Sequence, residues 1–223
     1  KEIGLRNSNF TNSTGWPDPE HKMSSKDLVT LANKIREEYP SYYRIFDDLE
    51  FTWDNISQKN RNPLLFMNLG ADGLKTGYTE EAGYGLIASV KQNKRRVTFV
   101  ITGLKSVEQR AREAKGITTW AFKKFKLKTY FKKNSIILEA PVWRGKKESV
   151  KISATNDVQI LLASDAKEGT EIQIVLKEPL VAPLKKGQKI NGHLVIKTTP
   201  LAETGVEIKQ LIFPIEVGED LHR

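Results

Sequence analysis

The stretch that decides the fold is Asp72-Gly73-Leu74-Lys75-Thr76-Gly77-Tyr78-Thr79. Within it, Lys75 can supply positive charge to an anionic group, and Thr76 can donate a hydrogen bond to the same group. Gly77 carries no side chain, so the backbone of a ligand can come close at that position. The stretch therefore predicts a β-strand that lies against an anionic ligand.

A hairpin and a long helix are expected directly after this strand. The apolar runs 83–91 and 96–102 flank a polar turn, which is typical of two antiparallel strands. The spacing Ser106-x-x-Gln109 is a capping box and begins a helix that we expect over 106–126. The buried face of that helix is expected to carry Ala114, Ile117, Ala121, Phe122 and Phe125. A strand, a hairpin and a closing helix indicate an α/β domain.

The N-terminal part predicts a loop followed by a helix. Residues 1–23 are rich in Asn, Ser, Thr, Gly and Pro, which favours an irregular segment. Ser24 or Ser25 can cap the helix. Apolar side chains then recur at helical spacing at Leu28, Leu31, Ala32 and Ile35. The helix is expected to end before Pro40, because a residue that precedes proline avoids helical backbone.

The pattern changes from about Thr129 to short apolar segments separated by turn residues. The expected strands are 136–140, 150–154, 158–163, 171–176, 190–197 and 207–214. The turns between them include Thr155-Asn156-Asp157 and Thr204-Gly205. Such spacing indicates an all-β sandwich or small barrel. We therefore expect an α/β domain over 1–128 and a β-rich domain over 129–223.

Composition limits the classes of protein that need to be considered. The chain has 223 residues, 28% of them charged, and no cysteine, so disulfides and thiolate metal sites are excluded. A formal charge of +9 makes nucleic-acid binding a candidate function. However, the basic clusters 94–96 and 123–128 are short and are interpreted as solvated turn and helix-end surface, so no nucleic acid is expected. A P-loop is excluded because Leu74 stands directly before Lys75, where that motif needs glycine.

The stretch around Lys75 closely resembles the D-alanyl-D-alanine carboxypeptidases of serine peptidase family S11, the low-molecular-mass penicillin-binding proteins. The resemblance extends over nearly the whole chain. Residues of the N-terminal loop fit the family pattern Phe-x-Asn-x-x-Gly-x-Pro-Asp-x-x-His at Phe10, Asn12, Gly15, Pro17, Asp18 and His21. Trp16 stands where leucine or methionine is more usual. Residues 51–53 and 60–65 continue the resemblance, and 182–188 with Gly192 resemble the β-domain that follows the peptidase domain.

The resemblance implies a serine peptidase that removes the terminal D-alanine from peptidoglycan stem peptides. In the family a serine attacks the carbonyl between the two D-alanines, a lysine acts as general base, and β-lactams acylate the same serine. Lys75 is then expected to supply charge to the terminal carboxylate and to assist proton transfer, Thr76 to donate to that carboxylate, and Gly77 to allow close approach. The backbone N–H of Tyr78 is expected to form part of the oxyanion hole.

The nucleophile serine and the base lysine of that mechanism are expected to lie outside these 223 residues. Ser-x-x-Lys occurs once, at Ser164-Asp165-Ala166-Lys167, between two β-runs and after Lys75 rather than before it. Ser25-Lys26-Asp27 resembles a Ser-x-Asn motif only superficially and stands where a helix cap belongs. We therefore expect the 223-residue chain alone to be inactive and not to bind penicillin covalently.

Other candidate residues are fewer. Arg110 is either an exposed arginine in the first turn of a helix or, by the resemblance, a contact for the substrate carboxylate. His21, His193 and His222 show no metal-binding spacing, so neither a metal nor a cofactor is expected, and His21 is assigned a structural hydrogen bond near the rim of the active site.

Two alternatives belong to other classes. A class A β-lactamase would end after the helix at 106–126 and would lack the last 95 residues. The second alternative is a non-catalytic binding module near the membrane or the cell wall, in which the β-domain is the docking part. Family members lie in the bacterial periplasm and usually continue into a C-terminal anchor for the inner membrane, which we expect these residues to lack.

Overall fold

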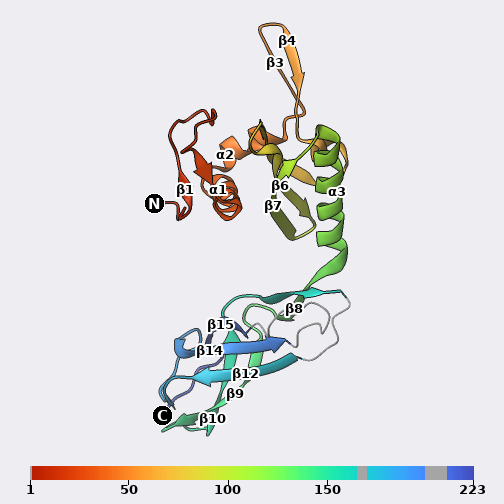
Figure 1. Ribbon diagram of the computed structural model, residues 1–223. Coiled ribbons are helices and arrows are strands. Elements are labelled where there is room, and N and C mark those ends of the chain that lie inside the picture. Colours follow the sequence, from red (N-terminus) through yellow and green to blue (C-terminus); the bar gives the residue numbers. More distant parts are fainter. Residues whose placement is uncertain (1, 165–169, 199–209) are drawn as a thin grey trace. The chain divides into compact units, whose positions relative to one another are not determined.

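The computed structural model describes residues 2–164, 170–198 and 210–223 (Figure 1). It divides into two compact units, Lys1–Lys123 and Lys124–Arg223. No helix in the described part of the chain is long and apolar enough to cross a membrane.

The first unit is built on a three-stranded antiparallel sheet of order β5-β6-β7. Its strands are β5 (Ala71–Thr79), β6 (Gly83–Gln92) and β7 (Arg95–Leu104). Asn93 takes a positive φ of 54° in the tight turn between β6 and β7, a conformation that asparagine tolerates better than most residues. The predicted hairpin is confirmed, with both strands slightly longer than expected.

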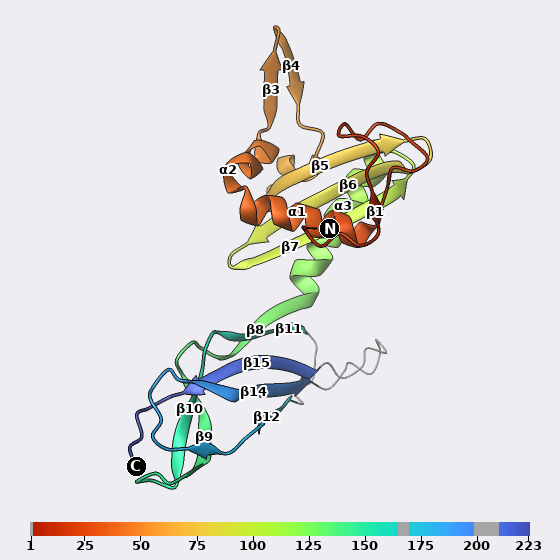
Figure 2. The same cartoon turned by 90° about the vertical axis from the view of Figure 1, so that its left-hand side faces the viewer.

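Two helices cover opposite faces of this sheet (Figures 1 and 2). They are α1 (Ser25–Glu38) and α3 (Val107–Lys124). Ser24 caps α1 by accepting a hydrogen bond from the N–H of Asp27 at 3.2 Å. At the start of α3 the N–H of Gln109 donates to Ser106 Oγ at 3.1 Å, as the capping box predicts. Both predicted helices are confirmed, and α3 ends two residues earlier than expected.

Each face of the sheet has its own apolar core. On the α3 side, Leu86, Ala88 and Val90 of β6 pack with Ala114. A second cluster joins Ala32 of α1 to Leu74 of β5 and includes Tyr43. Because β5 and β6 take part in these clusters, the strand that carries Lys75 rests on buried apolar contacts.

Shorter elements connect these main ones: β1 (Ser8–Asn9), β2 (Lys22–Met23), α2 (Pro40–Tyr43), η1 (Arg44–Asp47), β3 (Glu50–Trp53), β4 (Ile56–Lys59) and η2 (Pro63–Phe66). The β3–β4 hairpin was not expected. Asp54 and Asn55 both take positive φ values, 47° and 58°, in its two-residue turn. A pair of Asp or Asn residues between short alternating segments is the signal that predicts such a turn.

The second unit is all-β, as predicted. One sheet has six strands in the order β12-β14-β15-β10-β9-β13, and a second sheet pairs β11 with β8. The strands are β8 (Phe125–Phe131), β9 (Ile136–Trp143), β10 (Ser149–Ala154), β11 (Val158–Ala163), β12 (Thr170–Leu176), β13 (Leu180–Val181), β14 (Lys189–Thr198) and β15 (Gln210–Val217). The expected Thr204-Gly205 turn and the start of the last expected strand, 207–209, lie outside the described residues.

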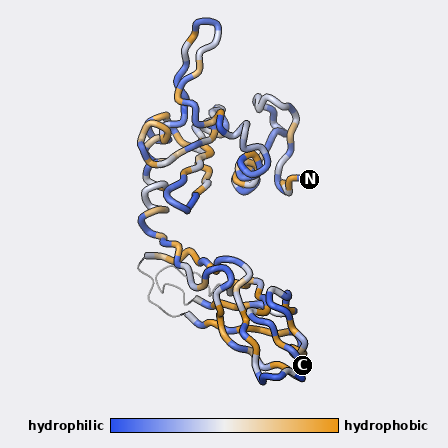
Figure 3. Tube along the Cα trace, turned by 180° about the vertical axis from the view of Figure 1, so that it is seen from behind, coloured by the Kyte–Doolittle hydropathy of each residue, from blue (hydrophilic) through white to orange (hydrophobic). Residues whose placement is uncertain are grey.

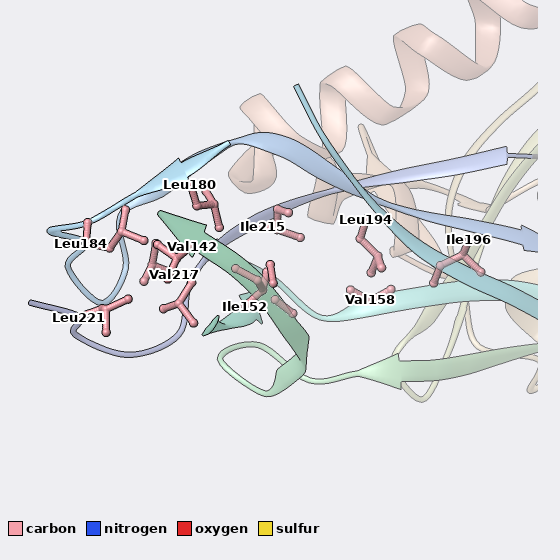
Figure 4. Packing of buried hydrophobic residues seen from close by; sticks show 14 of the residues in the cluster. Val142, Ile152, Val158, Leu180, Leu184, Leu194, Ile196, Ile215, Val217 and Leu221 are labelled. Atoms are coloured by element: carbon pink, nitrogen blue, oxygen red, sulfur yellow. The ribbon is translucent and has the colours of Figure 1, made fainter. Parts of the chain in front are cut away.

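A buried apolar cluster fills this unit (Figure 4). Ile152 of β10, Leu194 and Ile196 of β14 and Val158 of β11 are all at most 1% exposed. Apolar and polar residues alternate along many of these strands (Figure 3), which is the pattern expected when one face of each strand meets a core.

The structure corrects the sequence interpretation at β8. Residues 123–128 were expected to form a solvated helix end, but the helix stops at Lys124 and a strand begins at Phe125. Phe125 pairs with Ala163 and Leu127 with Leu161 of β11. The sequence from Phe125 alternates apolar and polar residues, so its period of two favoured a strand over a helix.

Candidate active site

β5 is an edge strand and presents the Lys-Thr-Gly segment. Lys75 pairs with Ile87 of β6 and Gly77 with Gly85. In the part of the chain that the structure describes, no strand pairs with the other edge of β5. A free edge offers backbone N–H and C=O groups to an extended peptide. Lys75 and Gly77 are exposed and Thr76 is half-buried, so the segment is accessible along its length.

The space beside this segment is open. Lys75 Nζ donates to the carbonyl of Thr76 at 2.6 Å, which holds the ammonium group next to the strand. A Cβ added at Gly77 would meet no heavy atom within 4 Å, so a ligand backbone has room there. A cavity of about 240 Å³ is lined by Lys75, Gly77, other residues of β5 to β7, and Leu28 of α1. Charge, a hydroxyl and free space therefore occur together at one edge of the sheet.

A polar cluster anchors the strand just before this segment. Arg96 of β7 forms a bidentate ion pair with Asp72, with NH1 to Oδ1 and NH2 to Oδ2 both at 2.6 Å. Tyr43 donates its hydroxyl to Asp72 Oδ1 at 2.9 Å, and Arg96 also donates to Ser89 Oγ at 2.5 Å. The cluster ties β5 to β6, β7 and α2. Because Asp72 lies three residues before Lys75, it sets the position of the exposed segment.

The cluster shifts the pKa of its members in opposite directions. Burial alone would raise the pKa of Asp72, but hydrogen bonds from Arg96 and Tyr43 outweigh it and hold that pKa below the usual value. Burial raises the pKa of Tyr43 to about 12, and the neighbouring Asp72 carboxylate adds to the shift. Asp72 is thus ionised and Tyr43 is neutral at neutral pH, which is the state that the hydrogen bonds require.

The raised pKa of Tyr43 predicts a specific loss of stability at alkaline pH. A pKa raised in the folded state contributes stability that is complete below about pH 10 and is lost as the pH rises through about 12. We expect the Tyr43→Phe variant to lack this step. Absorbance of tyrosinate during an alkaline titration checks it, since the parent should show a step near pH 12 that Tyr43→Phe lacks. Identical titration curves for the parent and Tyr43→Phe would contradict the assignment.

Asn62 holds β5 through a buried hydrogen bond to its backbone. It is fully buried, donates through Nδ2 to the carbonyl of Gly73 at 2.8 Å, and accepts from the N–H of Leu64 at 3.1 Å. Both groups are backbone atoms that the surrounding core keeps from water. Asn62 therefore connects the turn that precedes β5 to the strand itself.

Replacing Asn62 by alanine is expected to destabilise the first unit by about 1–3 kcal/mol, because two buried backbone groups lose their partners. Amide hydrogen exchange in β5 measures the effect. The exposed Gln58 of β4 gives a control, and Gln58→Ala should change stability by no more than about 0.5 kcal/mol. Equal exchange rates in the two variants would contradict the role of Asn62.

Arg110 is buried, which bears on one of its two expected roles. Its residue surface is 5% exposed, so the expectation of an exposed arginine is wrong. One guanidinium nitrogen donates to the carbonyl of Arg61 at 3.3 Å, and Nε has no partner among the described residues. Burial lowers the pKa of Arg110. Its guanidinium lies 5.8 Å from the ring of Tyr84, whose centroid is 4.4 Å from that of the tilted Tyr78 ring.

The N-terminal loop is fixed by two side chains. Asn12 Oδ1 accepts from the N–H groups of Gly15 at 2.8 Å and Trp16 at 3.1 Å, and its Nδ2 donates to the carbonyl of Trp16. Buried Asp27 accepts from the hydroxyl of Ser8 and from two backbone N–H groups of the loop. The loop is thus ordered although its residue types predict no regular structure.

His21 makes the structural hydrogen bond that was expected. Its Nδ1 lies 3.2 Å from the N–H of Thr11, which donates to it, and its ring meets the ring of Phe10 edge-on. Ser24 caps α1, so the interpretation of Ser25-Lys26-Asp27 as part of a helix start is confirmed. Among the described residues no group of His, Asp and Glu side chains could hold a metal ion.

The structure also places the basic cluster 94–96 and Ser164. The cluster 94–96 is not simply solvated surface, because Arg96 belongs to the ion pair described above and Arg95 donates to the carbonyl of Ala121 at 2.8 Å. Only Lys94 of the three is exposed. Ser164 follows β11 in the second unit, away from any helix start, and Lys167 lies outside the described residues.

Lys-Thr-Gly is one of the three motifs that penicillin-binding proteins share with class A β-lactamases. Here it lies on the exposed edge of a sheet that is packed between two helices, in a chain with a second, β-rich unit. These features indicate the class of proteins that includes the penicillin-binding proteins. Comparison with known proteins agrees. The family described as D-alanyl-D-alanine carboxypeptidase matches residues 1–106, and the family described as the C-terminal domain of penicillin-binding protein 5 matches residues 125–216. The chain belongs to the D-alanyl-D-alanine carboxypeptidases, the low-molecular-mass penicillin-binding proteins.

Individual relatives support this assignment. The chain is 34% identical over 192 residues to D-alanyl-D-alanine carboxypeptidase DacC of Escherichia coli, a match that covers 85% of the chain and 48% of that protein. It is 30% identical over 222 residues to DacF of Bacillus subtilis, covering 94% of the chain and 56% of that protein. The chain therefore spans about half the length of the curated relatives it matches.

Solved structures give the same fold. Penicillin-binding protein 5 of Haemophilus influenzae matches with a TM-score of 0.77 and 32% identity, over all of this chain and 63% of that one. Penicillin-binding protein D2 of Listeria monocytogenes, solved in an ampicillin-bound form, matches 55% of this chain with a TM-score of 0.51 and 26% identity. The match to the penicillin-binding protein 5 C-terminal domain disfavours a class A β-lactamase, which carries no such domain.

Proposed function

We propose that the protein carrying this chain is a serine D-alanyl-D-alanine carboxypeptidase that trims peptidoglycan stem peptides in the bacterial periplasm. The observation that carries the proposal is the exposed Lys75-Thr76-Gly77 segment on the free edge of β5, in a chain of this family. A free strand edge can take an extended peptide, and the adjacent ammonium and hydroxyl groups suit a terminal carboxylate.

In the proposed reaction, a serine hydroxyl attacks the carbonyl between the two D-alanines and its proton passes to a lysine. The C–N bond breaks, the terminal D-alanine leaves with a proton on its amine, and water then hydrolyses the acyl-enzyme. Lys75 would neutralise the terminal carboxylate and Thr76 would donate to it. The N–H of Tyr78 would stabilise the oxyanion, a contribution worth roughly a hundred- to a thousandfold in rate elsewhere. The serine and the lysine base would come from outside these 223 residues.

Arg110 and the second unit have supporting roles in the same proposal. The guanidinium of Arg110 lies 5.8 Å from the ring of Tyr84, the β6 partner of Tyr78. This position supports a role for its charge beside the Lys75–Tyr78 segment that would hold the substrate. Residues 1–128 would be the C-terminal part of the peptidase domain. Residues 129–223 would be a β-rich domain that precedes an anchor in the inner membrane. β-Lactam antibiotics would acylate the complete enzyme, and no nucleic acid would be needed.

Intact-mass spectrometry with penicillin tests the proposal. The full-length gene product is expected to gain the mass of one penicillin and to release D-alanine from a D-Ala-D-Ala peptide. A product limited to the 223 residues is expected to gain no mass. A full-length product that neither takes up penicillin nor releases D-alanine would refute the activity. An adduct on the 223-residue product would refute the assignment of the nucleophile to another region.

A further inference from the structure

The first unit has a second cavity at the C-terminal end of β5, the strand that carries Lys75. We propose that this cavity binds the cationic side chain of the amino acid that precedes D-Ala-D-Ala in the substrate peptide. Its carboxylates, Asp18, Glu80 and Glu81, would hold the ammonium group, and Trp16 would cover the methylene groups that lead to it. The proposal rests on the proposed carboxypeptidase function and adds to it a preference for one class of peptide.

The cavity is formed by two segments that are far apart in the sequence. Its volume is about 780 Å³. One wall is the N-terminal loop, residues 15–19 and 21–23, and the other is the turn 79–82 between β5 and β6, with Thr102 and Gly103 of β7. This volume falls within the range of pockets that enclose small ligands. The two walls meet only because the loop folds back onto the end of the sheet.

The lining has a charge opposite to that of the chain. The chain carries a formal charge of +9, whereas the cavity is lined by Asp18, Glu80 and Glu81 against Lys22 and His21. Trp16, also in the lining, is 75% exposed. Carboxylates attract an ammonium group, and the face of an indole ring adds to that attraction. A side chain with methylene groups and a terminal amine fits both features.

A peptide bound along β5 would extend toward this cavity. With the terminal carboxylate at Lys75 and Thr76 and the attacked carbonyl at the N–H of Tyr78, earlier residues of the peptide continue toward the end of β5. A strand rises about 3.3 Å per residue. Thr79, the last residue of β5 and part of the cavity lining, is therefore one such step beyond Tyr78, and Glu80 follows it in the turn. The residue before D-Ala-D-Ala is one residue from the attacked carbonyl, and its side chain spans the remaining distance.

Both walls are held in place without a ligand. The side chain of Asn12 bonds both the N–H and the carbonyl of Trp16. The turn is closed by the N–H of Ala82, which donates to Thr79 Oγ1 at 3.0 Å, and by Thr102 Oγ1, which donates to the carbonyl of Ala82 at 3.2 Å. A preformed cavity loses less conformational freedom on binding than a mobile one.

The test compares two peptides that differ in one charge. The full-length gene product is assayed for D-alanine release from a Lys-D-Ala-D-Ala peptide and from the same peptide with the lysine side chain acetylated. We expect kcat/KM to be about five- to tenfold higher for the free amine. In the Glu80→Gln/Glu81→Gln variant this ratio should fall to about one to two. The Glu20→Gln variant is the matched control, because Glu20 lies in the same loop but not in the cavity lining, and it should keep the ratio.

The outcomes separate this inference from the proposed function. Release of D-alanine from both peptides at equal rates would overturn the inference and leave the carboxypeptidase function standing. A ratio unchanged by Glu80→Gln/Glu81→Gln would overturn the assignment to this cavity. No release from either peptide would refute the proposed function itself. Thermal melting checks the fold of the double variant. If that variant does not fold, Asp18→Asn is assayed in its place, and it should lower the ratio at least twofold.

Discussion

Replacing Lys75 by alanine in the full-length gene product is expected to lower kcat/KM for D-alanine release by about a hundred- to a thousandfold. The magnitude is that of removing one charged or hydrogen-bonding group from a site where charge is stabilised during acyl transfer. Lys75 is exposed and its Nζ bonds only the neighbouring Thr76 carbonyl among the contacts described. The loss should therefore appear in catalysis and not in folding.

Two controls make this expectation specific. Lys75→Arg keeps the charge beside the strand and should recover part of the lost rate, although a planar guanidinium does not replace an ammonium group in every geometry. The thermal midpoint of Lys75→Ala should stay close to that of the parent, since a change at an exposed residue shifts stability by about 0.5 kcal/mol or less. A Lys75→Ala enzyme within threefold of the parent rate would refute the proposed role.

Much of the fold could be predicted from local signals. The capping residues Ser24 and Ser106, the helical spacing of apolar residues and the break at Pro40 predicted both long helices, and alternating runs predicted the β6–β7 hairpin. These signals act over a few residues, so a sequence displays them directly. β8 was missed because its lysines suggested a solvated helix end, while its period of two was the better guide.

The candidate site was predictable only where its residues are consecutive. The segment at Lys75 to Tyr78 was chosen for its chemistry and its place in a family pattern. The polar cluster that anchors this segment could not be predicted in the same way. Tyr43 and Arg96 lie 29 and 24 residues along the chain from their partner Asp72. Burial of Arg110 was missed for the same reason. Long-range pairs leave no local pattern, and a cluster such as 94–96 looks like surface until its partners are known.

The ion pair of Arg96 with Asp72 gives the second large effect. We expect Arg96→Ala to destabilise the first unit by about 2–3 kcal/mol. Breaking a buried pair costs more than breaking an exposed one, because the remaining charge is left without a partner. The side chains here are 22% and 27% exposed, so the cost is set below that of a fully buried pair. Hydrogen exchange of the β5 and β6 amides measures it within the first unit, separately from the second.

Two further results would tie this loss to the pair itself. In the Asp72→Ala/Arg96→Ala variant, the destabilisation should be smaller than the sum of the two single changes by about 0.5–3 kcal/mol. The pKa of Asp72 is lowered in the folded state, so the contribution of the pair is present above about pH 4 and is lost as the pH falls through that lowered pKa. The difference between the parent and Arg96→Ala should therefore shrink in acid. A difference that stays constant down to about pH 2 would mean that Arg96 stabilises β5 by packing and not by its charge.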